Sequence, residues 1–179
     1  RYIVPDYAKF MREGSKFLQL EPPKDIYEAI NSLLIFYKNV PSVTNYPVYL
    51  GNIDELLEPF MDDVDEAQAK KLFKLFFTHI DRTVLDSFSH ADIGPKATRA
   101  GRLILEVERE LLDAVPNITM KYDTDITPDD FGIECVKTAL KTAKPSFANH
   151  KMFKKELGEN YVIASCYNGL LLGGGSYTL

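Results

Sequence analysis

Helical and strand-like segments alternate along most of this chain, and that alternation limits its fold more than any other feature. Four stretches repeat apolar residues at helical spacing, and shorter stretches between and after them favour strands. The predicted helices cover residues 25–37, 65–80, 100–114 and 127–140. The predicted strands cover residues 43–50, 87–91, 118–122, 146–149 and 161–165. Because strands separated by such helices form βα crossovers, we expect an α/β fold with parallel strands.

Two of these helices have clear start signals. Asp25 followed by Glu28 is a capping-box pattern, which satisfies backbone N–H groups in the first helical turn. Thr127 is placed to cap the last helix, and Pro128 suits its first position because proline lacks the N–H that would be unpaired there. These signals support helices that begin near residues 25 and 128.

The composition excludes several classes of protein. The 179 residues are 45% hydrophobic and carry a net charge of −5, which argues against a nucleic-acid binder. The lysines clustered at residues 70–74 and 151–155 lie on helical patterns or among acidic residues, so we interpret them as solvated surfaces. No apolar run approaches the roughly 18 residues of a membrane-spanning helix. We therefore expect neither a nucleic-acid nor a membrane partner.

The two ends and the two cysteines indicate the context of the chain. Residues 1–6 have no apolar signal-peptide core and no initiator methionine, and residues 176–179 resemble the start of a strand. We expect the chain to be an internal part of a longer protein. Cys135 and Cys166 lie in very different settings, so a reducing cytoplasm is the expected location.

Polar residues near the ends of the predicted strands are candidate ligand contacts. In parallel α/β folds, ligands usually meet the loops at the carboxyl ends of the strands. The candidates selected by this rule are Asn45, His90, Asp92, Asn149 and Cys166. Asp123 and Asp125 also follow a strand, but they belong to an acidic group that leads into a helix start.

Cys166 is the sharpest chemical feature. It follows the strand-like run 161–165 and precedes Asn168-Gly169, a pair that predicts a turn, with three consecutive glycines at 173–175. This pattern presents a thiol at the tip of a strand and turn. The alternative is that Cys166 packs as a small buried hydrophobe, which is common for a free cysteine. Cys135 lies on the apolar face of a predicted helix, and we interpret it as part of the core.

Other site patterns are absent or weak. The glycines at 173–175 are followed by Ser176 without a lysine, so they do not form a nucleotide phosphate loop. The histidines at positions 79, 90 and 150 are far apart, and none pairs with another at the spacing of helical zinc ligands. A Cys166–histidine pair for nucleophilic catalysis remains open, because sequence does not show which residues are adjacent in space.

The segment from Ser165 to Gly175 resembles the glycyl radical enzymes, and it is most similar to their YjjI-type branch. Residues 1–10, 40–44, 93–95 and 126–130 resemble the same branch, so the likeness extends along the chain. The resemblance implies a ten-stranded α/β barrel made of two five-stranded halves, and the five predicted strands would form one half. Residues 1–40 would then be a helical N-terminal segment of a single domain. Residues 41–179 would be βα units that end at a finger loop carrying the cysteine.

The resemblance also implies a radical mechanism. A glycyl radical near the C-terminus would take a hydrogen atom from Cys166, and the resulting thiyl radical would abstract hydrogen from a small-molecule substrate. No glycine of this chain matches the radical loop, so the radical glycine would lie outside it and the chain alone should be inactive. The implied partners are an S-adenosylmethionine radical activase and a second copy in a homodimer. The chain itself would bind no cofactor, and its metabolism would be anaerobic and cytoplasmic.

Departures from better-known members leave the reaction open. The pyruvate formate-lyase branch carries two adjacent cysteines, whereas Ser165 precedes Cys166 here. Dehydratase and lyase members place a glutamate two residues after the cysteine, whereas this chain has Asn168, which cannot act as a base. His90 or Asp92 would have to supply that function. The candidate substrate contacts are Asn45, His90, Asp92, Asn149 and Asn168.

Two other functions remain possible at this point. Cys166 could be the nucleophile of a thiol enzyme, in which case its pKa should be lowered and it should be alkylated rapidly in air. The chain could also be a non-catalytic binding module that keeps the fold without the chemistry.

Overall fold

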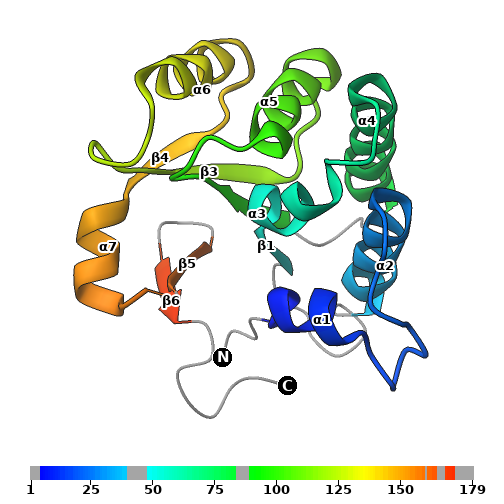
Figure 1. The fold of residues 1–179 in the computed structure, drawn as a ribbon. Helices are drawn as coiled ribbons and strands as arrows, with labels where there is room; N and C mark the ends of the chain where they lie inside the picture. Colours follow the sequence, from blue (N-terminus) through cyan, green and yellow to red (C-terminus); the bar gives the residue numbers. More distant parts are fainter. Residues whose placement is uncertain (1–4, 40–47, 84–88, 160, 165–167, 172–179) are drawn as a thin grey trace.

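The structure, a computed structural model, describes residues 5–39, 48–83, 89–159, 161–164 and 168–171 (Figure 1). The helices are α1 (Tyr7–Glu13), α2 (Ile26–Asn39), α3 (Ile53–Leu57), the 3₁₀ helix η1 (Glu58–Phe60), α4 (Glu66–Thr83), α5 (Arg99–Leu111), α6 (Asp129–Thr142) and α7 (His150–Leu157). The strands are β1 (Val48–Asn52), β2 (Ser89–Ile93), β3 (Asn117–Tyr122), β4 (Ser146–Asn149), β5 (Tyr161–Ala164) and β6 (Asn168–Leu171).

Strands β1 to β4 form a parallel sheet in which each strand pairs with the next one in the chain. Helix α4 lies in the connection from β1 to β2, α5 connects β2 to β3, and α6 connects β3 to β4. The predicted α/β fold with parallel strands is therefore confirmed. The four long predicted helices correspond to α2, α4, α5 and α6, and the first four predicted strands correspond to β1 to β4.

The two faces of the sheet have different partners. In Figure 1, helices α4, α5 and α6 lie on one face, and the β5–β6 pair lies on the other. Ala91, Ile93, Ile118 and Met120 point into the main core with the helices. Ala148 instead packs with Tyr161 and Ile163 of β5 in a separate, smaller cluster. The residues that alternate with the core residues along β2 and β3 therefore point to the side of the sheet on which β5 lies.

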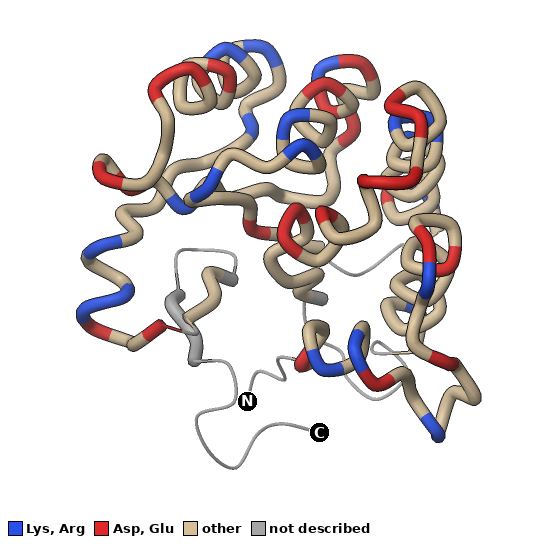
Figure 2. Tube along the Cα trace, in the orientation of Figure 1, with Lys and Arg blue, Asp and Glu red and all other residues tan. Residues whose placement is uncertain are grey.

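Charged side chains tie the outer helices together. Lys70 on α4 lies 3.0 Å from Glu106 and 2.6 Å from Glu110, both on α5. Arg102 on α5 contacts Asp130 and Glu134 on α6, at 2.5 and 3.0 Å. Figure 2 shows both signs of charge mixed along these helices. The predicted solvated lysine surface on α4 thus faces acidic residues of α5.

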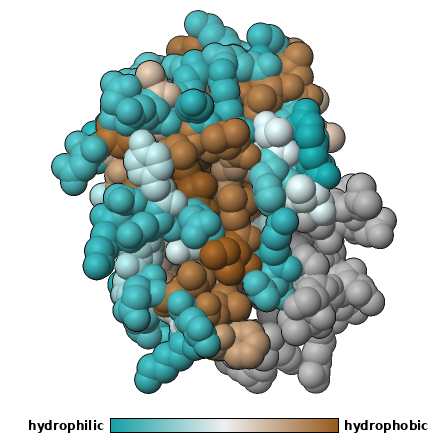
Figure 3. All heavy atoms as spheres, turned by 90° about the vertical axis from the view of Figure 1, so that its right-hand side faces the viewer, coloured by the Kyte–Doolittle hydropathy of each residue, from teal (hydrophilic) through white to brown (hydrophobic). Residues whose placement is uncertain are grey.

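Apolar side chains also gather on the face of the molecule formed by α2 and α4 (Figure 3). On α4, Phe73, Phe76 and Phe77 are buried, whereas Leu75 is 58% exposed. The apolar stripe of α4 is therefore wider than the part that the core covers. Among the described residues, no helix combines the length and apolar character needed to cross a membrane.

The last predicted strand does not join the parallel sheet. β5 pairs antiparallel with β6, and Ile163 lies opposite Gly169. The prediction of a turn at Asn168-Gly169 is wrong, because both residues belong to β6. An Asn-Gly pair favours a two-residue turn only when it falls between the strands, and here residues 165–167 join them.

Three short α-helices and the 3₁₀ helix η1 were not predicted. α1, α3 and α7 have 7, 5 and 8 residues, too few for a repeated apolar stripe. The predicted boundaries also differ at β1, which extends to Asn52, and at β2, which extends to Ile93. His90 therefore lies inside β2 and not at its end.

Candidate functional site

A buried carboxylate on β2 lies at the centre of the polar face that β5 covers. Asp92 is 0% exposed, and its Oδ2 accepts hydrogen bonds from Tyr49 Oη at 2.9 Å and from the Ile163 backbone N–H at 3.0 Å. The Lys121 ammonium lies 3.4 Å from the same oxygen. Burial raises the pKa of the Asp92 carboxyl, and the nearby Lys121 charge opposes that rise. Asp92 Oδ1 has no hydrogen-bond partner.

Lys121 on β3 completes this group with a second bond to β5. Its ammonium donates to Asn52 Oδ1 at 2.7 Å and to the Tyr161 backbone carbonyl at 3.1 Å. It also lies 4.7 Å from the centre of the Tyr161 ring, a cation–π distance. An ammonium has three N–H donors, and Asn52, Tyr161 and Asp92 supply an acceptor for each. Lys121 therefore has a structural role, since it joins β1, β2 and β5 through these three acceptors.

A β-bulge in β1 brings Asn52 into this group. The register of β1 against β2 shifts between Tyr49 and Asn52, which pair with His90 and Asp92. Because side chains alternate between faces along a strand, residues three apart would normally point to opposite sides. The extra residue of the bulge restores the phase, so Tyr49 and Asn52 both reach the Asp92–Lys121 group. Gly51 provides the positive φ of 80° within the bulge.

Tyr161 continues the polar network to α7. Its Oη lies 2.7 Å from His150 Nδ1, and its ring stacks on Phe153 with centroids 5.5 Å apart. Burial lowers the pKa of His150 and raises the pKa of Tyr161. The first residue of β5 is therefore fixed by its carbonyl, its hydroxyl and its ring together.

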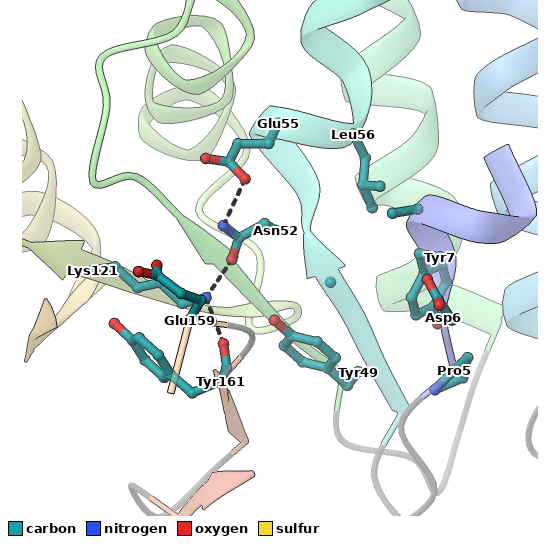
Figure 4. A pocket seen from close by; sticks show the side chains of 12 residues that line it. Pro5, Asp6, Tyr7, Tyr49, Asn52, Glu55, Leu56, Lys121, Glu159 and Tyr161 are labelled. Carbon is teal, nitrogen blue, oxygen red and sulfur yellow. Dashed lines mark hydrogen bonds between the residues drawn. The ribbon is translucent and has the colours of Figure 1, made fainter. Parts of the chain in front are cut away.

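A pocket of about 340 Å³ opens beside this network (Figure 4). It lies between α1 and the carboxyl ends of β1 and β3, and Figure 4 shows Asn52 between Glu55 and Lys121. Asp6, Glu55 and Glu159 also line it and are exposed. Asp92 neutralises Lys121, and Lys154 pairs with Glu159 at 2.8 Å, so Asp6 and Glu55 give the pocket its net negative charge. An anionic ligand is therefore disfavoured there.

The structure brings two of the predicted site residues together. His90 and Asp92 lie two apart on β2, roughly 6.6 Å along the strand, and both point to the face that β5 covers. His90 is 5% exposed, its Nε2 has no hydrogen-bond partner, and burial lowers its pKa. His90 Nε2 and Asp92 Oδ1 are thus two buried polar atoms that a bound molecule could satisfy.

Asn149 lies apart from this pair. It is exposed, and its side-chain oxygen accepts a hydrogen bond from the Met152 backbone N–H, which caps α7. Its register partner is Tyr122, and it alternates with Ala148, whose side chain packs against β5. Asn149 thus points away from His90 and Asp92, and its capping role explains its residue type.

The three remaining predicted site residues are Cys166, Asn45 and Asn168. Cys166 and Asn45 lie outside the described residues, and for Asn168 only the backbone pairing with Ala164 is described. In sequence, Cys166 is the middle of the three residues that join β5 to β6.

Sequence reasoning missed the residues that surround Asp92: Tyr49, Asn52, Lys121 and Tyr161. The available signal was Lys121, a charged residue within a strand whose neighbour Met120 is apolar. A lysine that is 5% exposed must find a partner, because an isolated buried charge is strongly disfavoured. In the described part of the chain, no three His, Cys, Asp or Glu side chains gather as metal ligands do.

Comparisons with known proteins place the chain in a family. The model of the YjjI-like glycyl radical enzymes matches residues 1–179. An uncharacterised protein of Haemophilus influenzae is 50% identical over 179 residues, which cover all of this chain and 34% of that protein. The uncharacterised protein YjjI of Escherichia coli is 43% identical over 180 residues, which cover 35% of that protein. The chain therefore spans about a third of the length of these relatives. It belongs to the YjjI-like family of glycyl radical enzymes.

Proposed function

We propose that the chain is the cysteine-bearing part of a glycyl radical enzyme in which Cys166 becomes a thiyl radical. The radical glycine would lie elsewhere in a longer, cytoplasmic and anaerobic protein, and an S-adenosylmethionine radical activase would generate it. The glycyl radical then takes the hydrogen atom from the Cys166 thiol, leaving a C–H bond on the glycine and an unpaired electron on sulfur. The thiyl radical takes a hydrogen atom from the substrate, which reforms the thiol and leaves a substrate radical.

The observation that carries this proposal is the placement of β5. Tyr161, Val162 and Ile163 are each at most 2% exposed, and the strand bonds to side chains of two sheet strands. A radical needs such enclosure, because water, oxygen and stray hydrogen donors would destroy it. The segment that carries Cys166 thus begins from a buried and fixed strand.

The substrate would be a small organic molecule bound against the sheet face. His90 Nε2 and Asp92 Oδ1 are buried there without partners, and each could accept a hydrogen bond from a substrate hydroxyl or amine. Dehydratase and lyase members use a glutamate as the base at the position of Asn168. Either His90 or Asp92 could serve as the base in its place. Asn45 and Asn168 stay candidate contacts by their place in the sequence, whereas Asn149 caps α7 and points away from this face. Half of an α/β barrel, completed by the rest of a homodimeric protein, would enclose the site.

The decisive experiment needs no knowledge of the substrate. The full-length protein is activated anaerobically in D₂O, and the glycyl radical is followed by electron paramagnetic resonance. Because a thiol hydrogen exchanges with solvent, reversible transfer between the glycine and Cys166 would replace the glycine α-hydrogen by deuterium. The splitting of the signal by that hydrogen should then disappear in the wild type.

Two variants make this test specific. Cys166→Ala should keep the splitting, since it lacks the thiol that carries deuterium to the glycine. Cys135→Ala is the matched control, because Cys135 is buried in the core, and it should lose the splitting as the wild type does. Retention of the splitting in the wild type, or its loss in Cys166→Ala, would refute the thiyl role. Rapid alkylation of Cys166 in air would then favour a thiol nucleophile.

A further inference from the structure

We infer that Asp92 and Lys121 form a positioning pair that sets the place of β5 on the sheet, and with it the place of Cys166. The inference rests on the proposed function for the role of Cys166, but the contacts on which it depends are independent of that role. Asp92 and Lys121 come from neighbouring strands, β2 and β3, and each bonds to the backbone of β5. Through these bonds the pair acts on the strand, whereas Asp92 Oδ1, which has no partner, is the atom proposed to face the substrate.

The two bonds meet the same edge of β5. Backbone groups of residues two apart point in the same direction along a strand, so the Ile163 N–H and the Tyr161 carbonyl lie on one edge. Asp92 satisfies the N–H, and Lys121 satisfies the carbonyl. The pair therefore does for this edge what a neighbouring strand would do. It terminates an edge that a two-stranded hairpin would otherwise leave unpaired.

Two bonds to successive positions also fix the register of the strand. A slip of β5 by one residue would present the wrong backbone groups and would turn Tyr161 and Ile163 to the opposite face. Both side chains are buried where they are, and Tyr161 also bonds to His150. A two-stranded hairpin is marginally stable by itself, so these contacts decide where it sits.

The chemistry of the pair favours specificity over stability. Apolar residues of similar size often stabilise a core as well as a buried ion pair does, because burying two charges is costly. Asp92 and Lys121 are 0% and 5% exposed, and their separation of 3.4 Å is longer than that of the buried Glu108–Lys144 pair, at 2.5 Å. Their bonds to the backbone of β5, at 3.0 and 3.1 Å, are shorter than that separation. Asp92 also accepts from Tyr49 at 2.9 Å, and Lys121 donates to Asn52 at 2.7 Å.

Small errors in this position would matter for the reaction. Hydrogen transfer needs its donor and acceptor atoms about 3 to 3.5 Å apart, and a misplacement of about 1 Å can cost on the order of 10²-fold in rate. Cys166 follows the last described residue of β5 by two positions. Because only one residue separates them in the sequence, we expect a shift of the strand to change the position of Cys166 as well.

The test compares two buried ion pairs in the full-length protein. Asp92→Ala removes the acceptor of the Ile163 N–H, and Asp92→Asn keeps an acceptor oxygen without the charge. Glu108→Ala is the matched control, since it breaks the buried Glu108–Lys144 pair, whose lysine donates to the Pro116 carbonyl and not to β5. The first measurement is hydrogen exchange of the inactive protein, resolved at the Ile163 amide. The second is deuterium transfer to the glycyl radical after activation.

Asp92→Ala should speed exchange at Ile163 on the order of tenfold relative to the core, the effect of one lost hydrogen bond. It should also slow deuterium transfer on the order of 10²-fold, and Asp92→Asn should recover part of both effects. Glu108→Ala should change neither one selectively. If Ile163 exchange is unchanged in Asp92→Ala, or if Glu108→Ala slows transfer as much, the positioning role is wrong. Absence of transfer in the wild type would refute the thiyl role, while exchange still decides whether Asp92 holds β5.

Discussion

The side chain of Asp54, just after β1, accepts a hydrogen bond from the backbone N–H of Gly94, just after β2, at 3.0 Å. Gly94 has φ of 78°, which strains any other residue, and a Cβ there would lie 2.7 Å from Met120 Sδ and displace that side chain. The same Asp54 oxygen accepts from Thr98 Oγ1 at 3.1 Å, while its other oxygen is buried without a partner. One carboxyl group thus joins the carboxyl ends of two neighbouring strands to the start of α5.

The first prediction is a pH dependence of stability that Asp54 causes. Burial, opposed by its hydrogen bonds, raises the pKa of Asp54 from 3.8 to about 7. The folded protein therefore holds a proton that the unfolded chain releases near pH 4. The stabilisation that this proton gives the folded state is fully present below pH 4. It is lost as the pH rises to about 7, and the free energy of unfolding then falls by a few kcal/mol.

Asp54→Asn should remove this dependence, because the amide keeps an acceptor oxygen and does not ionise. Thermal unfolding of the full-length protein between pH 4 and pH 8 should show a smaller decline in the variant. Asp25→Asn is the control, since Asp25 also bonds to a backbone N–H at a helix start but is exposed. Equal pH dependence in wild type and Asp54→Asn would contradict the assignment.

The second prediction concerns Thr98, which caps α5. Its hydroxyl accepts from the Gly101 N–H at 2.9 Å and donates to Asp54 at 3.1 Å. Thr98→Ala should lower the free energy of unfolding by about 1 to 2 kcal/mol, since it removes the cap and a partner of a buried carboxyl. Thr98→Ser keeps the hydroxyl and should retain most of the stability in denaturant titrations. Equal losses in both variants would show that the methyl group matters instead.

The regular part of the fold could be predicted because its signal repeats along the chain. Ile26, Ile30 and Leu33 recur at helical spacing, and all are buried on α2. The strand at 118–122 was recognised from its propensity and lies in the sheet as β3. Both signals are local, so they can be read from the sequence without knowing which segments pack together.

The site was harder to predict because it depends on which strands are neighbours. Asp92 was selected for its place near a strand end, but its partners Tyr49 and Lys121 lie 43 and 29 positions away in the sequence. Asn52 reaches them through a bulge in β1. The sequence signal for that bulge is Gly51, and a single glycine is a weak one. The antiparallel pairing of β5 was missed because Asn168-Gly169 favours a turn by its local preference.

The third prediction tests that bulge. Gly51 and Gly158 both have positive φ, 80° and 90°, so alanine strains the backbone at either position. At Gly51 the added Cβ would also meet Leu56 Cδ1 at 3.0 Å and Tyr7 at 3.4 Å, whereas Gly158 has open space. Gly158→Ala should cost about 1 kcal/mol, and Gly51→Ala should cost more. Denaturant titrations that find equal losses would show that the bulge adapts to a side chain.

The fourth prediction separates the two cysteines by their reactivity. Cys135 lies on the buried face of α6 and is 0% exposed, and burial raises the pKa of its thiol to about 12. At pH 8 the thiolate, which is the reactive form, should be nearly absent. Iodoacetamide should therefore modify Cys135 only when the protein unfolds, and the labelling rate should rise with denaturant in step with unfolding.

Peptide mass spectrometry can measure this labelling at Cys135 and Cys166 in the same sample. A core mutation on the same face, such as Phe131→Leu, should speed labelling of Cys135 by loosening its surroundings, because Phe131 is fully buried in the same core. Ile133→Ala is the surface control on α6, since Ile133 is 54% exposed, and it should leave the rate unchanged. Fast labelling of Cys135 in the native wild type would contradict its place in the core. It would also remove Cys135→Ala as a neutral control for the radical experiment.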